Sequence, residues 1–201
     1  NDYTDGIALQ TIKLVFQYLE KSVKTADPEA REKMHNASTM AGMAFANAFL
    51  GMSHSMAHKI GGVHHTVHGR TNAILLPYVI RYNGTRPSKT TTWPKYNYWK
   101  ADEKFQDIAK MLGLPHSTPE EAVEAYAKAV YDLGVAVGIK MNFKDQGIDE
   151  KTWKDSLHEI ALLAYEDQCS PANPRLPMVA DMEEIMADAY HGYAKKPGRR
   201  K

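Results

Sequence analysis

Five of the nine histidines in this 201-residue chain fall within fifteen positions, in the segment His54–His68 with the sequence HSMAHKIGGVHHTVH. Imidazole is the commonest metal ligand among side chains, and its charge changes nearest to neutral pH. The region just before it, MAGMAFANAFLG at residues 40–51, is almost purely small and apolar. Polar rings buried beside such a segment are costly unless they have partners. The pattern therefore favours a metal-binding or proton-transferring site.

His54 and His58 are four residues apart, so on a helix they project from the same face. His68 lies beyond Gly61-Gly62, where we expect that helix to end and the chain to turn back. Two imidazoles from separate elements can share one metal inside a helical bundle. We therefore expect His54 and His68 to be ligands. A catalytic ion usually has at least three protein ligands, so the others must come from elsewhere.

The sequence argues against several other kinds of active site, and not every histidine of the segment fits a metal ligand. A zinc protease of the HExxH type needs glutamate directly after the first histidine, where this chain has Ser55. His64 and His65 fit better as hydrogen-bonded or surface residues. The sequence contains neither GxGxxG nor GxxxxGK[ST], and it has no GxSxG nucleophile motif. Cys169 has no histidine near it in sequence, which disfavours a thiol nucleophile.

The elements that must position the histidines are predicted to be helices throughout, because apolar residues recur at helical spacing and no run alternates with a period of two. We expect an all-α fold of about seven to nine helices. The main ones are predicted near residues 3–23, 28–50, 53–61, 71–84, 99–112, 118–134, 149–168 and 178–193. Asp27 and Pro28 should open the second helix, and Ser53 should cap the histidine-bearing one. Because residues 37–50 carry no charge, that half-helix is expected to be buried on all sides.

Composition sets the broad class. With 43% hydrophobic and 24% charged residues the chain suits one soluble domain, and its net charge of +1 gives no reason to expect nucleic acid as a partner. No run approaches the roughly 18 apolar residues of a membrane span. The single cysteine, Cys169, suits a reducing cytoplasm. The chain opens without methionine, so we expect a fragment of a longer polypeptide with a frayed basic tail at 195–201. The aromatic residues around 93–99 are expected to cover the core or a subunit contact.

Three stretches, AGMAFANAFLGMSHSMAHKIGG, VHGRTNAILLPYVIRYN and DQCSPANPR, resemble the iron-containing (group III) alcohol dehydrogenases. More narrowly, they are similar to the C-terminal alcohol dehydrogenase part of the bifunctional aldehyde–alcohol dehydrogenases. The opening residues NDYTDGIALQTIKLVFQYLE also resemble that subfamily, so the likeness runs nearly end to end.

The resemblance implies reversible hydride transfer between NAD(H) and a short aldehyde or primary alcohol such as acetaldehyde or ethanol. It implies a divalent iron, in some members zinc, whose two later histidine ligands correspond to His54 and His68. His58 matches a histidine beside the nicotinamide and the alcohol, where it helps to move the proton. Phe45 and Cys169 match positions near the substrate pocket.

Two parts of the family pattern lie outside this chain. These are the nucleotide-binding domain and a DxxxH pair that supplies the first two ligands, expected just before Asn1. Residues 1–201 should thus form the helical metal-binding domain of a longer protein and should be inactive alone. We expect the full-length protein to be a homo-oligomer or filament. The alternative is a non-catalytic helical assembly module whose histidines are structural.

Overall fold

The computed structural model describes residues 1–87 and 99–193, and within them the chain forms eight α-helices, one 3₁₀ helix and no β-strand. The helices are α1 (Asp2–Thr25), α2 (Pro28–Ala48), α3 (Met52–His64), α4 (His68–Gly84), α5 (Ala101–Met111), α6 (Pro119–Ala136), α7 (Glu150–Tyr165), η2 (Ser170–Ala172) and α8 (Val179–His191). The predicted all-α class is confirmed. Most of the predicted aromatic group at 93–99 and the basic tail at 195–201 lie outside the described residues.

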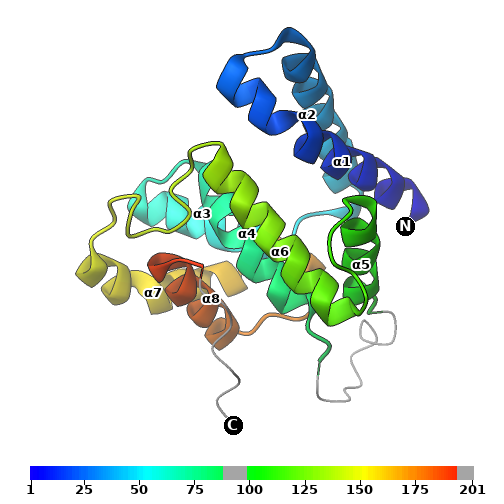
Figure 1. Ribbon diagram of the computed structural model, residues 1–201. Coiled ribbons are helices and arrows are strands. Elements are labelled where there is room, and N and C mark those ends of the chain that lie inside the picture. The colour runs from blue at the N-terminus through cyan, green and yellow to red at the C-terminus, as the bar shows by residue number, and fades with distance from the viewer. Residues whose placement is uncertain (88–98, 194–201) are drawn as a thin grey trace.

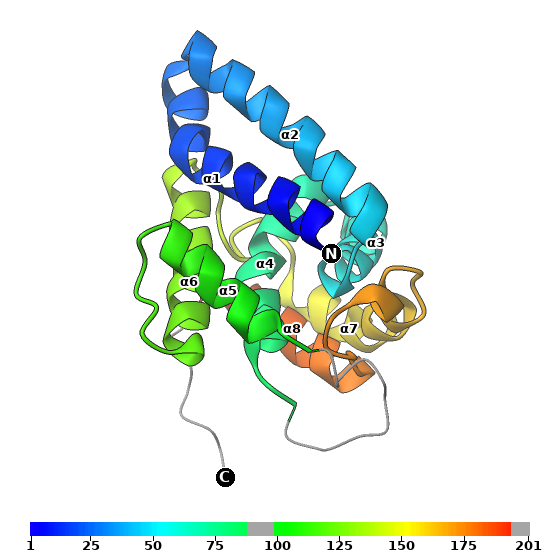
Figure 2. The same ribbon diagram turned by 90° about the vertical axis from the view of Figure 1, so that its right-hand side faces the viewer.

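Helix α4 lies at the centre and packs against α3, α5, α6 and α8. Helices α1 and α2 pack chiefly on each other, as a hairpin that stands above the remaining helices in Figure 1. Figure 2 shows the end of α2 reaching α3, the helix that carries His54, His58 and His64. None of the described helices combines the length and the apolar character that crossing a membrane requires.

Two clusters of apolar side chains fill the interior. The larger lies among α3, α4, α7 and α8 and includes Met56, Ile74 and Trp153. The smaller joins α4, α5 and α6, with Ile12 and Phe16 of α1 packed against it. The centre of α4 contributes to both clusters, so the helix that begins with His68 is held on several sides.

Helix α3 presents the histidines because its opposite face is apolar. Met52, Met56 and Ile60, each four residues apart, are all 0% exposed. At 100° per residue, His54 and His58 lie about 200° around the helix from Met56 and Ile60. Burial of each of these apolar side chains contributes about 1.5 to 3 kcal/mol, which fixes the face that turns inward. The histidine face is thereby directed away from the core.

The bounds of α3 differ from the prediction at both ends. Gly51, not Ser53, is its N-cap, and the Ser53 hydroxyl instead donates to Asn72 of α4. Gly61-Gly62 does not end the helix, which continues to His64. The last turn persists because the His64 ring packs against Trp153 and its Nε2 hydrogen-bonds to Ser156 of α7. Tertiary contacts thus outweigh the poor helix propensity of glycine, about 1 kcal/mol per residue.

The predicted all-round burial of residues 37–50 is wrong. Within that half of α2 only Ala37 and Ala44 are buried, while Met43 and Phe45 are each 47% exposed and Phe49 is 51% exposed. The absence of charge does not come from packing inside this chain, because α2 contacts mainly α1. By contrast, Asp27 caps α2 and Pro28 opens it as predicted.

Candidate metal centre

Three histidine rings meet where the beginnings of α3 and α4 come together. The ring centroids of His54 and His68 are 5.3 Å apart, those of His58 and His68 are also 5.3 Å apart, and those of His54 and His58 are 6.1 Å apart. Residues 65–67 reverse the chain between the two helices, and His65 adopts a left-handed conformation with φ 55° at the turn. The fold thus brings together the three histidines singled out in the sequence.

The separation of His54 and His68 fits a shared tetrahedral ion. Two imidazoles that point at one ion with nitrogen–metal distances of about 2.1 Å have their ring centres roughly 5 to 6 Å apart. Burial, and then the neighbouring rings of His68 and His58, lower the pKa of His54. A lowered pKa keeps the ring neutral, which is the form that binds metal.

The Asn72 side chain shows which nitrogen of His68 carries the lone pair. Its amide nitrogen donates to the His68 backbone carbonyl at 3.3 Å and its oxygen accepts from Ser53 at 3.0 Å, so the orientation of the amide is fixed. The same amide nitrogen lies 3.2 Å from Nε2 of His68, which must therefore accept. If the ring is neutral, Nδ1 then carries the proton, and a metal bound at Nε2 would replace the hydrogen bond from Asn72.

His58 is joined to Asp167, which follows α7. Nδ1 of His58 lies 3.2 Å from Oδ2 of Asp167, and Nζ of Lys59 lies 3.0 Å from the same oxygen. The other oxygen accepts from the backbone N–H of Cys169 at 3.0 Å. Burial opposes ionisation of Asp167, but the hydrogen bonds from Cys169, Lys59 and His58 outweigh it and hold the pKa of this carboxyl well below its usual value. Asp167 is thus an anion with both oxygens engaged.

The segment from Asp167 to Asn173 runs antiparallel along α3 and is fastened to it at regular intervals. Three side-chain hydrogen bonds join the two: Asn173 to Met52, Ser170 to Ser55 and Asp167 to His58. Each step moves three residues along both segments, close to one helical turn. This 167–173 segment therefore fixes the position of the histidine face of α3.

A second group of potential ligands adjoins the histidines. The ligating atoms of His58, Asp167 and Cys169 lie within 4.8 Å of one another. The Lys59 ammonium already neutralises Asp167, and burial raises the pKa of the Cys169 thiol to about 11 with a further contribution from the Asp167 hydrogen bond. A cation there would have to displace a lysine and deprotonate a stabilised thiol. This chemistry does not fit a metal site, and it sets His58 apart from His54 and His68.

The two predicted substrate-pocket residues lie in different surroundings. Cys169 is 1% exposed and sits beside Asp167, close to His58. Phe45 is half exposed on α2, and among the described residues no ring contact joins it to the histidine group. The structure brings Cys169 to the site but leaves Phe45 at the surface.

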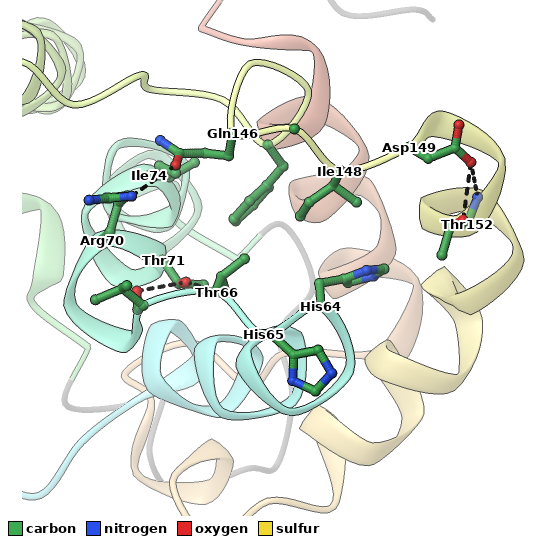
Figure 3. A pocket seen from close by; sticks show the side chains of 13 residues that line it. His64, His65, Thr66, Arg70, Thr71, Ile74, Gln146, Ile148, Asp149 and Thr152 are labelled. Atoms are coloured by element: carbon green, nitrogen blue, oxygen red, sulfur yellow. Dashed lines mark hydrogen bonds between the residues drawn. The ribbon is translucent and has the colours of Figure 1, made fainter.

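His64 and His65 lie apart from the three converging rings, on a cavity of about 310 Å³. Figure 3 shows this cavity between the α3–α4 turn and the loop that precedes α7. Its polar groups pair with one another: Arg70 donates to Gln146 at 3.3 Å, and Thr71 donates to Thr66 at 2.7 Å. His64 also hydrogen-bonds to Ser156, as expected for a structural residue.

Sequence reasoning did not single out Asp167, Lys59, Asn72 or Asn173. Asp167 and Asn173 both belong to the quoted stretch DQCSPANPR, which was recognised as a motif without a role for its polar residues. Their partners on α3 lie more than 100 residues earlier in the chain, so nothing in local spacing could have indicated the pairing.

Comparison with known proteins places these observations in a family. The protein-family model described as "Fe-containing alcohol dehydrogenase family, C-terminal" matches residues 1–190. An aldehyde-alcohol dehydrogenase of Streptococcus pneumoniae is 77% identical over the whole chain, which spans 23% of that protein.

Solved structures agree with this match. A 1,3-propanediol oxidoreductase superposes with a TM-score of 0.81 at 34% identity, over 94% of this chain and 46% of that one. A sulfoacetaldehyde reductase from Bifidobacterium kashiwanohense, solved in complex with NAD⁺, superposes with a TM-score of 0.70 at 25% identity, over 92% of this chain and 43% of that one. The chain thus spans less than a quarter of its curated relative and under half of these solved chains.

Proposed function

Because this chain belongs to the Fe-containing alcohol dehydrogenase family, as its C-terminal helical part, we propose that it supplies half of the metal site of an NAD-dependent alcohol dehydrogenase. In the full-length protein the enzyme interconverts short aldehydes, such as acetaldehyde, and primary alcohols. The observation that carries the proposal is the convergence of His54 and His68, whose ring centroids are 5.3 Å apart.

His54 and His68 would hold a divalent iron, with zinc as the alternative ion. When bound, the metal supplies Lewis acidity that polarises the substrate oxygen, and NAD(H) carries the hydride. Two imidazoles do not complete a catalytic site, which usually has three or more protein ligands. The remaining ligands, in a DxxxH pair, and the nucleotide-binding domain are proposed to lie in the part of the full-length protein beyond these 201 residues.

His58 is proposed to handle the proton beside the nicotinamide and the alcohol. Its side chain is 35% exposed, so a substrate hydroxyl has access to it, and its ring stacks at 5.3 Å on that of His68. In alcohol oxidation the hydroxyl proton must leave as the hydride is transferred, and a neutral imidazole can accept it. Cys169 and Phe45 would shape the substrate pocket without taking part in the chemistry.

The surface of α2 and the single cysteine bear on the assembly and the location of the full-length protein. The exposed apolar side chains of Met43 and Phe45 on α2, and of Phe49 at its C-cap, favour burial against another part of the full-length protein or another subunit. A homo-oligomer or filament is therefore proposed, with small aldehydes and alcohols, not nucleic acid or membrane, as partners. The unpaired Cys169 suits a cytoplasmic location. A purely structural assembly module would also use the α2 surface, but it would not need converging histidines.

Substitution of the ligands in the full-length protein tests the proposal. His54→Ala and His68→Ala should each lower bound metal, measured by elemental analysis, and abolish NADH oxidation with acetaldehyde. His158→Ala on α7 is the matched control, since its exposed ring pairs only with Glu183 among the described residues. The assembly-module alternative predicts that metal content stays normal and only stability changes. The 201-residue chain alone, supplied with ferrous iron, NADH and acetaldehyde, should show no turnover.

A further inference from the structure

The carboxylate of Asp167 has more hydrogen-bond partners than a simple ion pair with Lys59 would give it. Its side chain is 7% exposed, and it is bonded on one oxygen by His58 and Lys59 and on the other by the Cys169 amide. Its own backbone N–H donates to Ala164 at the end of α7. Since the 167–173 segment is also fastened to α3 at Ser55 and Met52, the carboxylate has a fixed position relative to His58.

This arrangement determines which nitrogen of His58 is available. A carboxylate can only accept, so the nitrogen that faces it, Nδ1, must carry a proton. In the neutral ring the lone pair is then on Nε2. Among the hydrogen bonds of residues 1–87 and 99–193, none occupies Nε2 of His58. This free nitrogen belongs to the ring that stacks on His68.

We propose that Asp167 is a positioning residue for the reaction: it holds His58 in the tautomer and orientation in which Nε2 accepts the proton of the alcohol. The inference rests on the proposed function, because it needs His58 to be the proton acceptor. In the oxidation direction the O–H bond of the alcohol breaks, its proton passes to Nε2, and the hydride leaves carbon for NAD⁺. In the reverse direction the same nitrogen returns the proton. Asp167 touches neither substrate nor cofactor and acts only through His58.

Lys59 has a separate part in this arrangement. Its ammonium shares Oδ2 of Asp167 with His58, so it adds to the Cys169 amide in keeping the carboxylate ionised and leaves the histidine bond intact. An ion pair of Asp167 with Lys59 would also hold the 167–173 segment against α3 without any role in catalysis. The test must therefore separate an effect that passes through His58 from a loss of stability alone.

A double-mutant cycle in the metal-loaded full-length protein makes that separation. Asp167→Asn places an amide where the carboxylate stands, and its NH₂ group can donate to Nδ1 and impose the opposite tautomer. We expect Asp167→Asn to lower kcat for ethanol oxidation by about ten- to a hundredfold, with the KM values for ethanol and NAD⁺ within about twofold of wild type. In a His58→Gln background the same change should cost less than about threefold, since the residue it acts through is gone.

Two further measurements exclude a general defect. Metal content by elemental analysis should be the same in Asp167→Asn and wild type, because Asp167 is not a ligand. Asp155→Asn on α7, an exposed carboxylate paired with Lys151, is the matched control and should leave kcat unchanged.

The outcomes are distinct. Normal kcat in Asp167→Asn, or an equal loss in both backgrounds, overturns the positioning role while the proposed function stands. Loss of metal in Asp167→Asn also overturns it, because Asp167 would then support the ligands. If the metal-loaded wild-type protein does not oxidise ethanol, or if His58→Gln retains wild-type kcat, the proposed function itself is wrong in that part.

Discussion

The side-chain oxygen of Asn173 accepts a hydrogen bond from the backbone N–H of Met52 at 3.2 Å, across 121 residues of chain. An N-terminal helix amide normally needs a capping side chain from its own segment, and the N-cap of α3 is a glycine without one. Asn173, 2% exposed, supplies the acceptor instead and is itself held by Asn83 and by the Arg175 carbonyl. The first turn of α3, which carries His54, is thus positioned from the other end of the chain.

Gly51→Ala should disturb this junction. A Cβ at Gly51 would lie 2.7 Å from Oδ1 of Asn173, and that side chain cannot swing aside without breaking its other hydrogen bonds. We expect a loss of about 1 to 3 kcal/mol in the free energy of unfolding, measured in urea on the 201-residue chain by circular dichroism. In the full-length protein the same substitution should reduce bound metal.

Gly62→Ala, eleven residues further along the chain, is the control for Gly51→Ala. Nothing lies within 4 Å of a Cβ placed there, so only the gain in helix propensity remains. It should stabilise the chain by up to about 1 kcal/mol. Equal effects of the two substitutions would contradict the close contact at Asn173.

Much of the fold could be predicted because the signals are local. Asp27 followed by Pro28 opens α2 as predicted, and α6, capped by Thr118, begins at Pro119, close to the predicted start near 118. Failures occur where distant residues decide the outcome. Ser53 is a good cap by type, yet Asn173 sets the start of α3 and frees the Ser53 hydroxyl for Asn72.

In the candidate site, too, the features set by nearby residues could be predicted and those set by distant residues could not. Helical spacing put His54 and His58 on one face, and the turn back to His68 could be expected from the glycines, although those glycines do not end the helix. The partner of His58 could not be predicted, because Asp167 is 109 residues away and no periodicity links them. The uncharged half of α2 led to a wrong prediction of burial, since an uncharged surface gives no sign of which part of the protein covers it.

Phe45→Ser tests whether the exposed ring has a role beyond this chain. With 47% of the residue exposed, its loss should change the free energy of unfolding of the 201-residue chain by less than about 0.5 kcal/mol. If Phe45 lines the substrate pocket, the full-length protein should show a KM for ethanol raised by about tenfold with kcat little changed, since a lost apolar contact is worth about 1 to 3 kcal/mol. An unchanged KM would remove Phe45 from the pocket.

Lys59→Met separates the charge beside Asp167 from the hydrogen bond to His58. Methionine keeps most of the apolar stem of Lys59, which is 31% exposed, but not its ammonium. The bond from His58 to Asp167 does not depend on that charge. We therefore expect kcat in the full-length protein to fall less than about threefold. The chain should lose about 1 kcal/mol of stability because the buried carboxylate keeps fewer partners. A loss of kcat as large as that of Asp167→Asn would show that Lys59 itself is needed for the proton transfer.

The Cys169 thiol should give the chain a measurable sensitivity to alkaline pH. Burial, and then the hydrogen bond to Asp167, raise the pKa of the folded thiol to about 11, whereas an unfolded thiol titrates near about 8.5. Between those values the unfolded chain releases a proton that the folded chain keeps, so stability falls as pH rises, by up to about 1.4 kcal/mol per pH unit. Below about pH 8 both states hold the proton and the contribution is fully present.

Cys169→Ser is the matched variant, because a hydroxyl keeps the hydrogen bond to Asp167 but does not titrate in this range. The difference in unfolding free energy between wild type and Cys169→Ser, measured in urea from pH 7 to 10, should be constant up to about pH 8. Above that pH the wild type should lose stability relative to Cys169→Ser. Iodoacetamide should label Cys169 slowly at neutral pH, since the thiol is 1% exposed and protonated, and labelling should become fast in urea. Rapid labelling of the folded chain, or parallel curves for the two proteins up to pH 10, would show that the thiol is neither shielded nor bonded to Asp167.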